Sequence, residues 1–115
     1  MENEKPIEVI FLKPAEDFIG KLDKKARNKL FQAMRKTQER IHGHWFKKLK
    51  GTNGIYEFRV DEGSKFYRLF AFWDKEGKTE TLIVGTHGIA KKTNKTQANE
   101  IQKAERLKQV YFDNK

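Results

Sequence analysis

The sequence IYEFRVDEGSKFYRLFAFW, residues 55–73, has the pattern of a β-hairpin. Residues 55–60 and 66–73 are rich in aromatic and β-branched side chains, and their apolar positions alternate with polar ones, as in strands that bury one face. Residues 61–64 between them contain Gly63 and have the composition of a hairpin loop. The segment therefore predicts two adjacent antiparallel strands.

Two further strands are expected outside this hairpin. Residues 79–85 (TETLIVG) follow a second glycine-containing loop at 74–77, and residues 7–12 (IEVIFL) form an apolar run that ends before Pro14. Proline cannot continue a strand ladder, so the first strand should stop there. The sequence thus predicts four strands.

Helical patterns occupy the remaining segments. Residues 15–21 predict a short helix, and after Asp23, a candidate N-cap, apolar residues recur at spacings of three and four as far as Ile41. Residues 97–110 predict a last helix. The order β-α-α-β-β-β-α predicts an α+β fold in a single domain, residues 1–115, with a mostly antiparallel four-stranded sheet and the helices packed on one face.

The chain is strongly basic, with 25 Lys and Arg against 16 Asp and Glu in 115 residues and a formal net charge of +9. This balance favours RNA, DNA or an acidic protein as the partner, although a membrane surface would also attract it. No apolar run approaches the roughly 20 residues of a spanning helix, and no signal peptide precedes the domain, so we expect a cytoplasmic protein without a membrane partner. With no cysteine and three histidines, no disulfide, metal site or cofactor is expected.

Strand alternation gathers charged residues on one face of the hairpin. Glu57 and Arg59 lie opposite Phe58 and Val60, which should point into the core. Arg68 of the neighbouring strand should emerge on the same exposed face. An open surface of this kind suits a nucleic-acid backbone. The alternative is that Glu57 pairs with an arginine and the rest of the surface is solvated.

Lysines gather in two other segments. The run KKTNKT, residues 91–96, lies between the last predicted strand and the last helix, where lysine, threonine and asparagine offer charge and donors to phosphates. The segment HWFKKLKGTNG, residues 44–54, projects more lysines, whereas Trp45 and Trp73 are expected in the core rather than as platforms for bases. Either run could be a solvated loop. The candidate RNA- or ribosome-binding residues are Lys47, Lys48, Lys50 and Lys95.

Several motifs occur in an order that resembles the RelE/ParE toxin superfamily, and its HigB-like, phage-derived branch in particular. They are FKKLKGTNGIYEFRV (46–60), FYRLFAFW (66–73) and LIVGTHGIAKKTNKT (82–96), followed by a helix with the pattern EI-x-x-A (100–104). The resemblance implies a compact, microbial ribonuclease-like fold without a metal. It also implies a bacterial type II toxin that cleaves mRNA on the ribosome and is neutralised by a cognate antitoxin of the helix-turn-helix type.

The chain departs from the family pattern in places. Ile89 stands where relatives often have an aromatic residue, and residues 97–98 are Gln-Ala where many have Thr-Pro. Several RelE-type enzymes stack an aromatic side chain on a base after the basic loop, and the late candidates here are Tyr111 and Phe112.

Metal-free RNA cleavage needs a proton acceptor for the 2′-hydroxyl, cations for the phosphorane, and a proton donor for the leaving oxygen. Arg59 and Arg68 suit the phosphate because a guanidinium can bind two oxygens at once. Lys91 and Lys92 can add positive charge. His87 is a candidate acid or base because its ordinary pKa lies near neutrality, with a turn-stabilising role as its alternative.

Glu57 is the other candidate base. The interpretation as an endoribonuclease competes with two others: a ParE-like toxin that inhibits gyrase by binding it, and a non-catalytic RNA-binding module. Codon preference, the identity of the antitoxin and the oligomeric state have no signal in the sequence.

Overall fold

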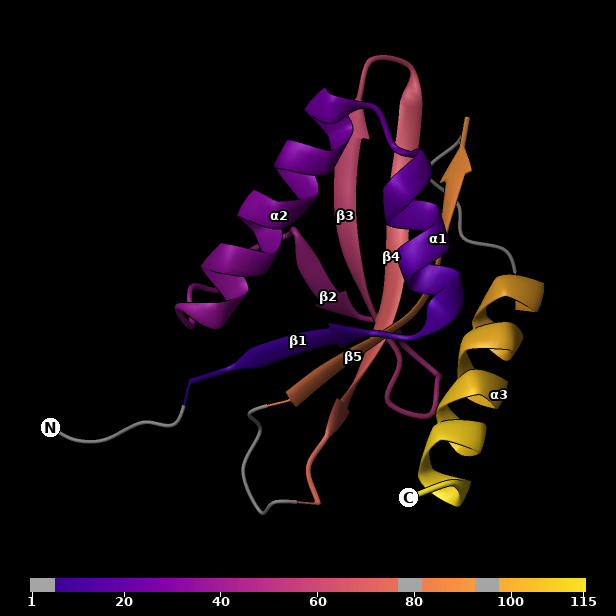
Figure 1. Ribbon diagram of the computed structural model, residues 1–115. Coiled ribbons are helices and arrows are strands. Elements are labelled where there is room, and N and C mark those ends of the chain that lie inside the picture. The colour runs from indigo at the N-terminus through magenta and orange to yellow at the C-terminus, as the bar shows by residue number, and fades with distance from the viewer. Residues whose placement is uncertain (1–5, 77–81, 93–97) are drawn as a thin grey trace, which may run out of the picture.

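A computed structural model describes residues 6–76, 82–92 and 98–115 of the protein (Figure 1). Lys95 and residues 79–81 of a predicted strand lie outside these ranges. The elements follow one another along the chain as β1 (Glu8–Phe11), α1 (Lys13–Lys21), α2 (Lys24–Gln38), β2 (Phe46–Lys48), β3 (Tyr56–Glu62), β4 (Lys65–Asp74), β5 (Leu82–Lys91) and α3 (Ala98–Asp113).

The strands form one mixed sheet in the order β1-β5-β4-β3-β2. β1 pairs with β5 in parallel, and the other neighbours are antiparallel. The α+β class and the mostly antiparallel sheet are therefore confirmed. The predicted strand number of four was one short, because β2 pairs with β3 at the sheet edge and is only three residues long. A strand of three residues is too short to show a clear alternation of apolar and polar residues in the sequence.

The predicted hairpin is formed by β3 and β4. Arg59 lies opposite Arg68, and Glu62 lies opposite Lys65 at the closed end. Gly63 in the turn has φ +62°, a conformation that glycine adopts without a steric penalty. This register confirms that Arg59 and Arg68 are neighbours on one face of the sheet.

The main core lies between the sheet and the first two helices. Leu30 and Met34 of α2 and Ile19 of α1 are buried in one cluster with side chains of β3, β4 and β5 such as Phe58 and Leu69. At the start of α2, the side chain of Asp23 accepts a hydrogen bond of 2.8 Å from the Ala26 N–H, as an N-cap does. α1 and α2 therefore cover one face of the sheet.

α3 belongs to a second, smaller core on the other face. Its buried Ala104 packs with Ile55 and Phe70, and Figure 1 shows α3 set apart from α1 and α2. The prediction that the helices pack on one face was wrong for α3. The physical reason is strand alternation, which points Phe70 and Phe72 to the face opposite the first core. Both side chains are fully buried, so that face also has to be covered. No helix in the described ranges is both long and apolar enough to cross a membrane.

Candidate nucleic-acid interface

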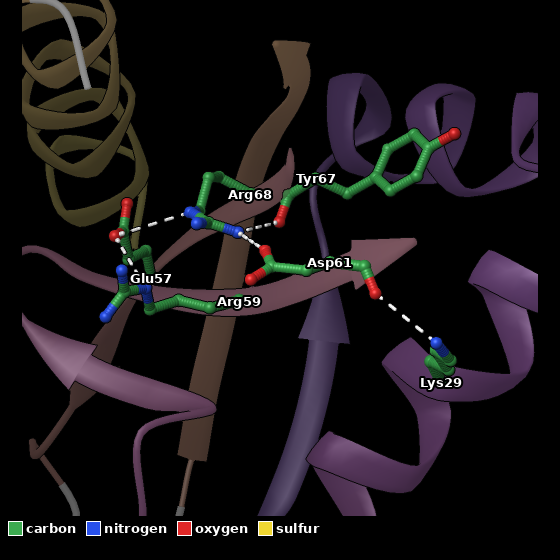
Figure 2. A network of polar contacts seen from close by, with 6 residues as sticks. All are labelled: Lys29, Glu57, Arg59, Asp61, Tyr67 and Arg68. Carbon is green, nitrogen blue, oxygen red and sulfur yellow. Dashed lines mark hydrogen bonds and ion pairs between the residues drawn. The ribbon is translucent and has the colours of Figure 1, made fainter. Parts of the chain in front are cut away.

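Glu57 lies at the centre of a charged cluster on the α3 side of the sheet. Its Oε1 is 3.5 Å from Nε of Arg59 and 3.8 Å from Nε of Arg68, as Figure 2 shows. The residue is only 4% exposed. A carboxylate buried to this degree needs paired charges, and the two arginines supply them.

Arg68 is the most deeply placed member of this cluster, at 1% exposure. One of its terminal nitrogens donates to Oδ1 of Asp61 at 3.0 Å and to the carbonyl of Tyr67 at 2.9 Å. The prediction that Arg68 emerges on an open face was therefore wrong. The neighbouring carboxylates of Glu57 and Asp61 offset the cost of burying its charge.

Arg59 and Lys91 connect the cluster to the surface. The Arg59 side chain is 25% exposed. Lys91 is half-buried at the end of β5, opposite Phe66 of β4. Burial lowers the pKa of Lys91 most; the charge of Glu57 raises it, and the charges of Arg68 and Arg59 lower it further. The charges of all three residues thus influence Lys91, and the four residues together are called the basic cluster below.

The remaining predicted lysines differ in position. Lys47 on β2 is paired with Glu57 in register and exposed, so it extends the cationic surface toward the sheet edge. Lys48 is paired with Tyr56 and belongs by alternation to the other face. Lys50 is exposed in the turn after β2, and Lys92 is exposed just after β5. These four lysines therefore do not form a single patch.

His87 is buried at 2% exposure and lies apart from the basic cluster. Its ring stacks on Phe70 with centroids 4.8 Å apart, Nε2 lies 3.1 Å from Oε1 of Glu100, and Nδ1 lies 3.2 Å from the Thr86 hydroxyl. Burial lowers the pKa of His87. Lys91 is four positions further along β5, about 13 Å at 3.3 Å per residue. These contacts make His87 a link between the sheet and α3.

Tyr111, a candidate for base stacking, is half-buried in the described fold. Its hydroxyl donates to Oδ2 of Asp74 at 2.7 Å, and its ring meets Phe72 edge-on at 5.3 Å between centroids. The same carboxylate oxygen accepts from Lys115 at 2.7 Å. Tyr111 thus fastens the end of α3 to β4.

Sequence reasoning missed Asp61, which it assigned to the hairpin loop. The residue continues β3 and lies opposite Phe66. Its carbonyl also accepts from Lys29 of α2 at 3.3 Å (Figure 2). The signal was present, because Asp61 follows Glu57 and Arg59 at intervals of two.

No group of three His, Asp or Glu side chains within residues 6–76, 82–92 and 98–115 could hold a metal ion. That observation leaves the metal-free mechanism a prediction. The basic cluster combines a carboxylate, two arginines that contact it and a lysine that its charge influences. These groups suit the binding of a phosphate and a proton transfer beside it.

The fold is that of RelE toxins. The free-state structure of a double mutant of Escherichia coli toxin RelE superposes with a TM-score of 0.65 at 18% identity, covering 89% of this chain and 97% of that one. The RelBE2 toxin–antitoxin complex of Mycobacterium tuberculosis gives 0.52 at 20% identity, covering 81% and 100%. The archaeal RelE–RelB complex of Pyrococcus horikoshii gives 0.51 at 17% identity, covering 80% and 100%.

The sequence itself matches the family of phage-derived Gp49-like proteins (DUF891) over residues 17–109. The chain belongs to this family. A search of curated protein sequences found no significant match. The expected resemblance to RelE toxins is thus confirmed for the fold, and the family match is compatible with the phage-derived branch that the sequence resembles.

Proposed function

We propose that the protein is the toxin of a type II toxin–antitoxin system and acts as a metal-independent, ribosome-dependent mRNA endoribonuclease in the cytoplasm. The observation that carries this proposal is the basic cluster, in which the carboxylate of Glu57 lies beside Arg59 and Arg68 and its charge also acts on Lys91. A gyrase-binding toxin or a non-catalytic RNA-binding module transfers no proton, so neither would need a carboxylate among its cationic side chains. The RelE-like fold supports the same class of protein.

Glu57 is the proton acceptor in the proposed reaction. It takes the proton of the ribose 2′-hydroxyl, whose oxygen attacks the adjacent phosphorus. Arg59 stabilises the charge that develops on the phosphorane oxygens. Lys91 donates a proton to the departing 5′-oxygen, and its lowered pKa makes the ammonium a better acid than an ordinary lysine. The products are a 2′,3′-cyclic phosphate and a 5′-hydroxyl.

Arg68 acts on the phosphate after a side-chain movement. Asp61 occupies one of its terminal nitrogens, and the Asp61 side chain is itself 62% exposed. An incoming phosphate can therefore take the place of this carboxylate while Asp61 turns into solvent. The buried Nε side of Arg68 remains beside Glu57 and keeps that carboxylate in place.

His87 is the alternative acid or base from the sequence. Its burial and its contacts with Glu100 and Thr86 favour a positioning role for the sheet and α3 instead. Lys47, Lys50, Lys92 and Lys95 supply charge for ribosomal RNA in this proposal.

An antitoxin is the proposed protein partner. One of the similar structures is a toxin–antitoxin complex, and another is a complex of RelE with RelB. A chain with a net charge of +9 should attract an acidic or amphipathic antitoxin segment, and electrostatics should speed the encounter.

Primer extension on mRNA from cells expressing the protein tests the activity. Discrete cuts in translated messages are expected, and Glu57→Gln should remove them. Intact mRNA together with DNA damage would point to a gyrase inhibitor. Bound but uncut RNA, without growth arrest, would point to a binding module.

A further inference from the structure

A second hollow lies beyond the basic cluster, where β3 begins and β4 ends. It has a volume of about 550 Å³, within the usual range for small-molecule pockets. Its walls come from β2, β3, the end of β4 and the last turns of α3. The residues that line it are Lys48, Gly54, Tyr56, Trp73, Lys75, Glu76, Lys108 and Phe112.

Three aromatic rings border this hollow, and their neighbours hold them in place. Tyr56 stacks on Phe46 with centroids 5.0 Å apart and an interplanar angle of 16°, and it meets Trp73 edge-on at 6.5 Å. Phe112 packs against Phe72 at 5.5 Å. Tyr56, Trp73 and Phe112 are each only partly buried. Fixed rings that remain accessible are suited to stacking on a planar group such as a base.

Three lysines converge on the same hollow. Lys108 donates to the carbonyl of Asn53 at 2.7 Å, which fixes its ammonium close to Gly54. Burial lowers the pKa of Lys108 most, Glu105 raises it, and the nearby charges of Lys75 and Lys48 lower it further. Lys75 and Lys48 therefore repel the ammonium of Lys108, and an anion bound beside it would offset that repulsion.

The acidic residue of the lining pairs with a lysine that is not part of the lining. Glu76 is 3.1 Å from the ammonium of Lys115, which also contacts Asp74. The hollow thus combines aromatic faces with net positive charge. Lysines alone would suit an acidic peptide, whereas a nucleotide uses the rings and the lysines together.

We propose that this hollow binds an unpaired nucleotide of RNA, its base against Trp73 and Tyr56 and its phosphates near Lys48, Lys75 and Lys108. The choice of RNA as the ligand rests on the proposed function, whereas the location of the site rests on the residues that line the pocket. Tyr56 precedes Arg59 by three positions on β3, about 10 Å at 3.3 Å per residue. The pocket would therefore hold a different nucleotide from the one at the scissile phosphate.

The test uses Trp73 as a local fluorescent reporter. The chain has two tryptophans, so Trp45→Phe leaves Trp73 as the only one. A 2′-O-methyl uridine tetranucleotide, which cannot be cleaved, is titrated into this protein. Saturable quenching of Trp73 is expected. The variant Lys48→Ala/Lys75→Ala should weaken binding on the order of tenfold, because two ammonium groups that neutralise phosphates are removed.

The matched control is Lys21→Ala/Lys24→Ala, which removes the same charge from exposed positions on α1 and α2. It should bind within about twofold of the parent, allowing for the long-range field. Equal losses of affinity in the two double variants, or no quenching at all, would overturn the pocket assignment. Quenching by an acidic octapeptide but not by the tetranucleotide would also overturn it in favour of a protein ligand. Quenching by the tetranucleotide, together with no cleavage of mRNA on ribosomes, would support the pocket as an RNA-binding site and contradict the proposed endoribonuclease activity.

Discussion

Arg59 and Arg68 lie directly opposite each other across β3 and β4, and each approaches the same oxygen of Glu57. Two like charges at a cross-strand pair destabilise a sheet unless an acid lies between them. Glu57 provides that acid at 4% exposure. The proposed phosphate site, which uses both cations, would give this arrangement a function.

Arg68→Ala should cost both stability and activity. Its removal leaves the buried Glu57 without one partner, so the free energy of unfolding should fall by about 3–5 kcal/mol. Cleavage by the remaining folded protein should fall on the order of a hundredfold, as loss of one transition-state donor often does. Thermal melting and single-turnover cleavage well below the melting temperature measure the two effects.

Arg68→Lys is the matched variant, because it keeps the charge and loses the planar fork. It should restore part of the stability and little of the cleavage. A folded Arg68→Ala protein that cuts at the wild-type rate would remove Arg68 from the mechanism.

Lys91 should titrate below the ordinary lysine value of 10.5, because burial and two neighbouring arginines disfavour its charged form more than Glu57 favours it. As a proton donor it must be charged, so cleavage should decline as pH rises through this lowered pKa. Lys91→Arg should lower the cleavage rate and abolish this pH dependence, since an arginine keeps the positive charge but does not give up its proton. An NMR titration of labelled lysine side chains checks the shift. Titration of Lys91 at or above the ordinary lysine value would contradict it.

His87→Phe should separate anchoring from catalysis. The replacement keeps a ring against Phe70 and removes the polar interactions with Glu100 and Thr86. Stability should fall by about 1–3 kcal/mol, while cleavage by the folded protein should stay within severalfold of wild type. A hundredfold loss of cleavage with an unchanged melting temperature would restore His87 as an acid or base.

The double variant Lys47→Ala/Lys92→Ala removes two exposed lysines near the basic cluster. The log–log dependence of ribosome binding on salt should become shallower by about one unit for each phosphate that no longer has a lysine partner. Folding should hardly change, because both side chains are exposed. Lys21→Ala/Lys24→Ala serves as the control, and an equal change of slope in both would mean that general charge alone explains the effect.

Period-two alternation was enough to predict the cross-strand neighbours Arg59 and Arg68, because the hairpin register follows from its turn. It could not predict that Arg68 is buried. That depends on Asp61, which continues β3 although its composition suggested a loop, and on the cover that α3 gives to this side of the sheet. The sequence also could not predict on which face of the sheet α3 packs. The apolar stripe of an amphipathic helix shows which side of the helix is buried, but not which surface it packs against.

His87 illustrates the same limit at a single residue. Its ordinary pKa suggested acid–base chemistry, but its burial and its stacking on Phe70 arise from the bulge between β4 and β5, which the sequence does not mark. Lys91 was predicted in a loop and instead is the last residue of β5, where the charge of Glu57 acts on it.

Single-turnover cleavage of mRNA on programmed ribosomes by Glu57→Gln is the decisive measurement. Glutamine keeps the shape of the side chain and a hydrogen-bond acceptor for the arginines, but it cannot take up the proton of the 2′-hydroxyl. The cleavage rate should fall by about 10²–10⁴-fold, while ribosome binding stays close to that of the wild type. A folded Glu57→Gln protein that binds ribosomes and cleaves at the wild-type rate would contradict the assignment of the basic cluster as the catalytic site.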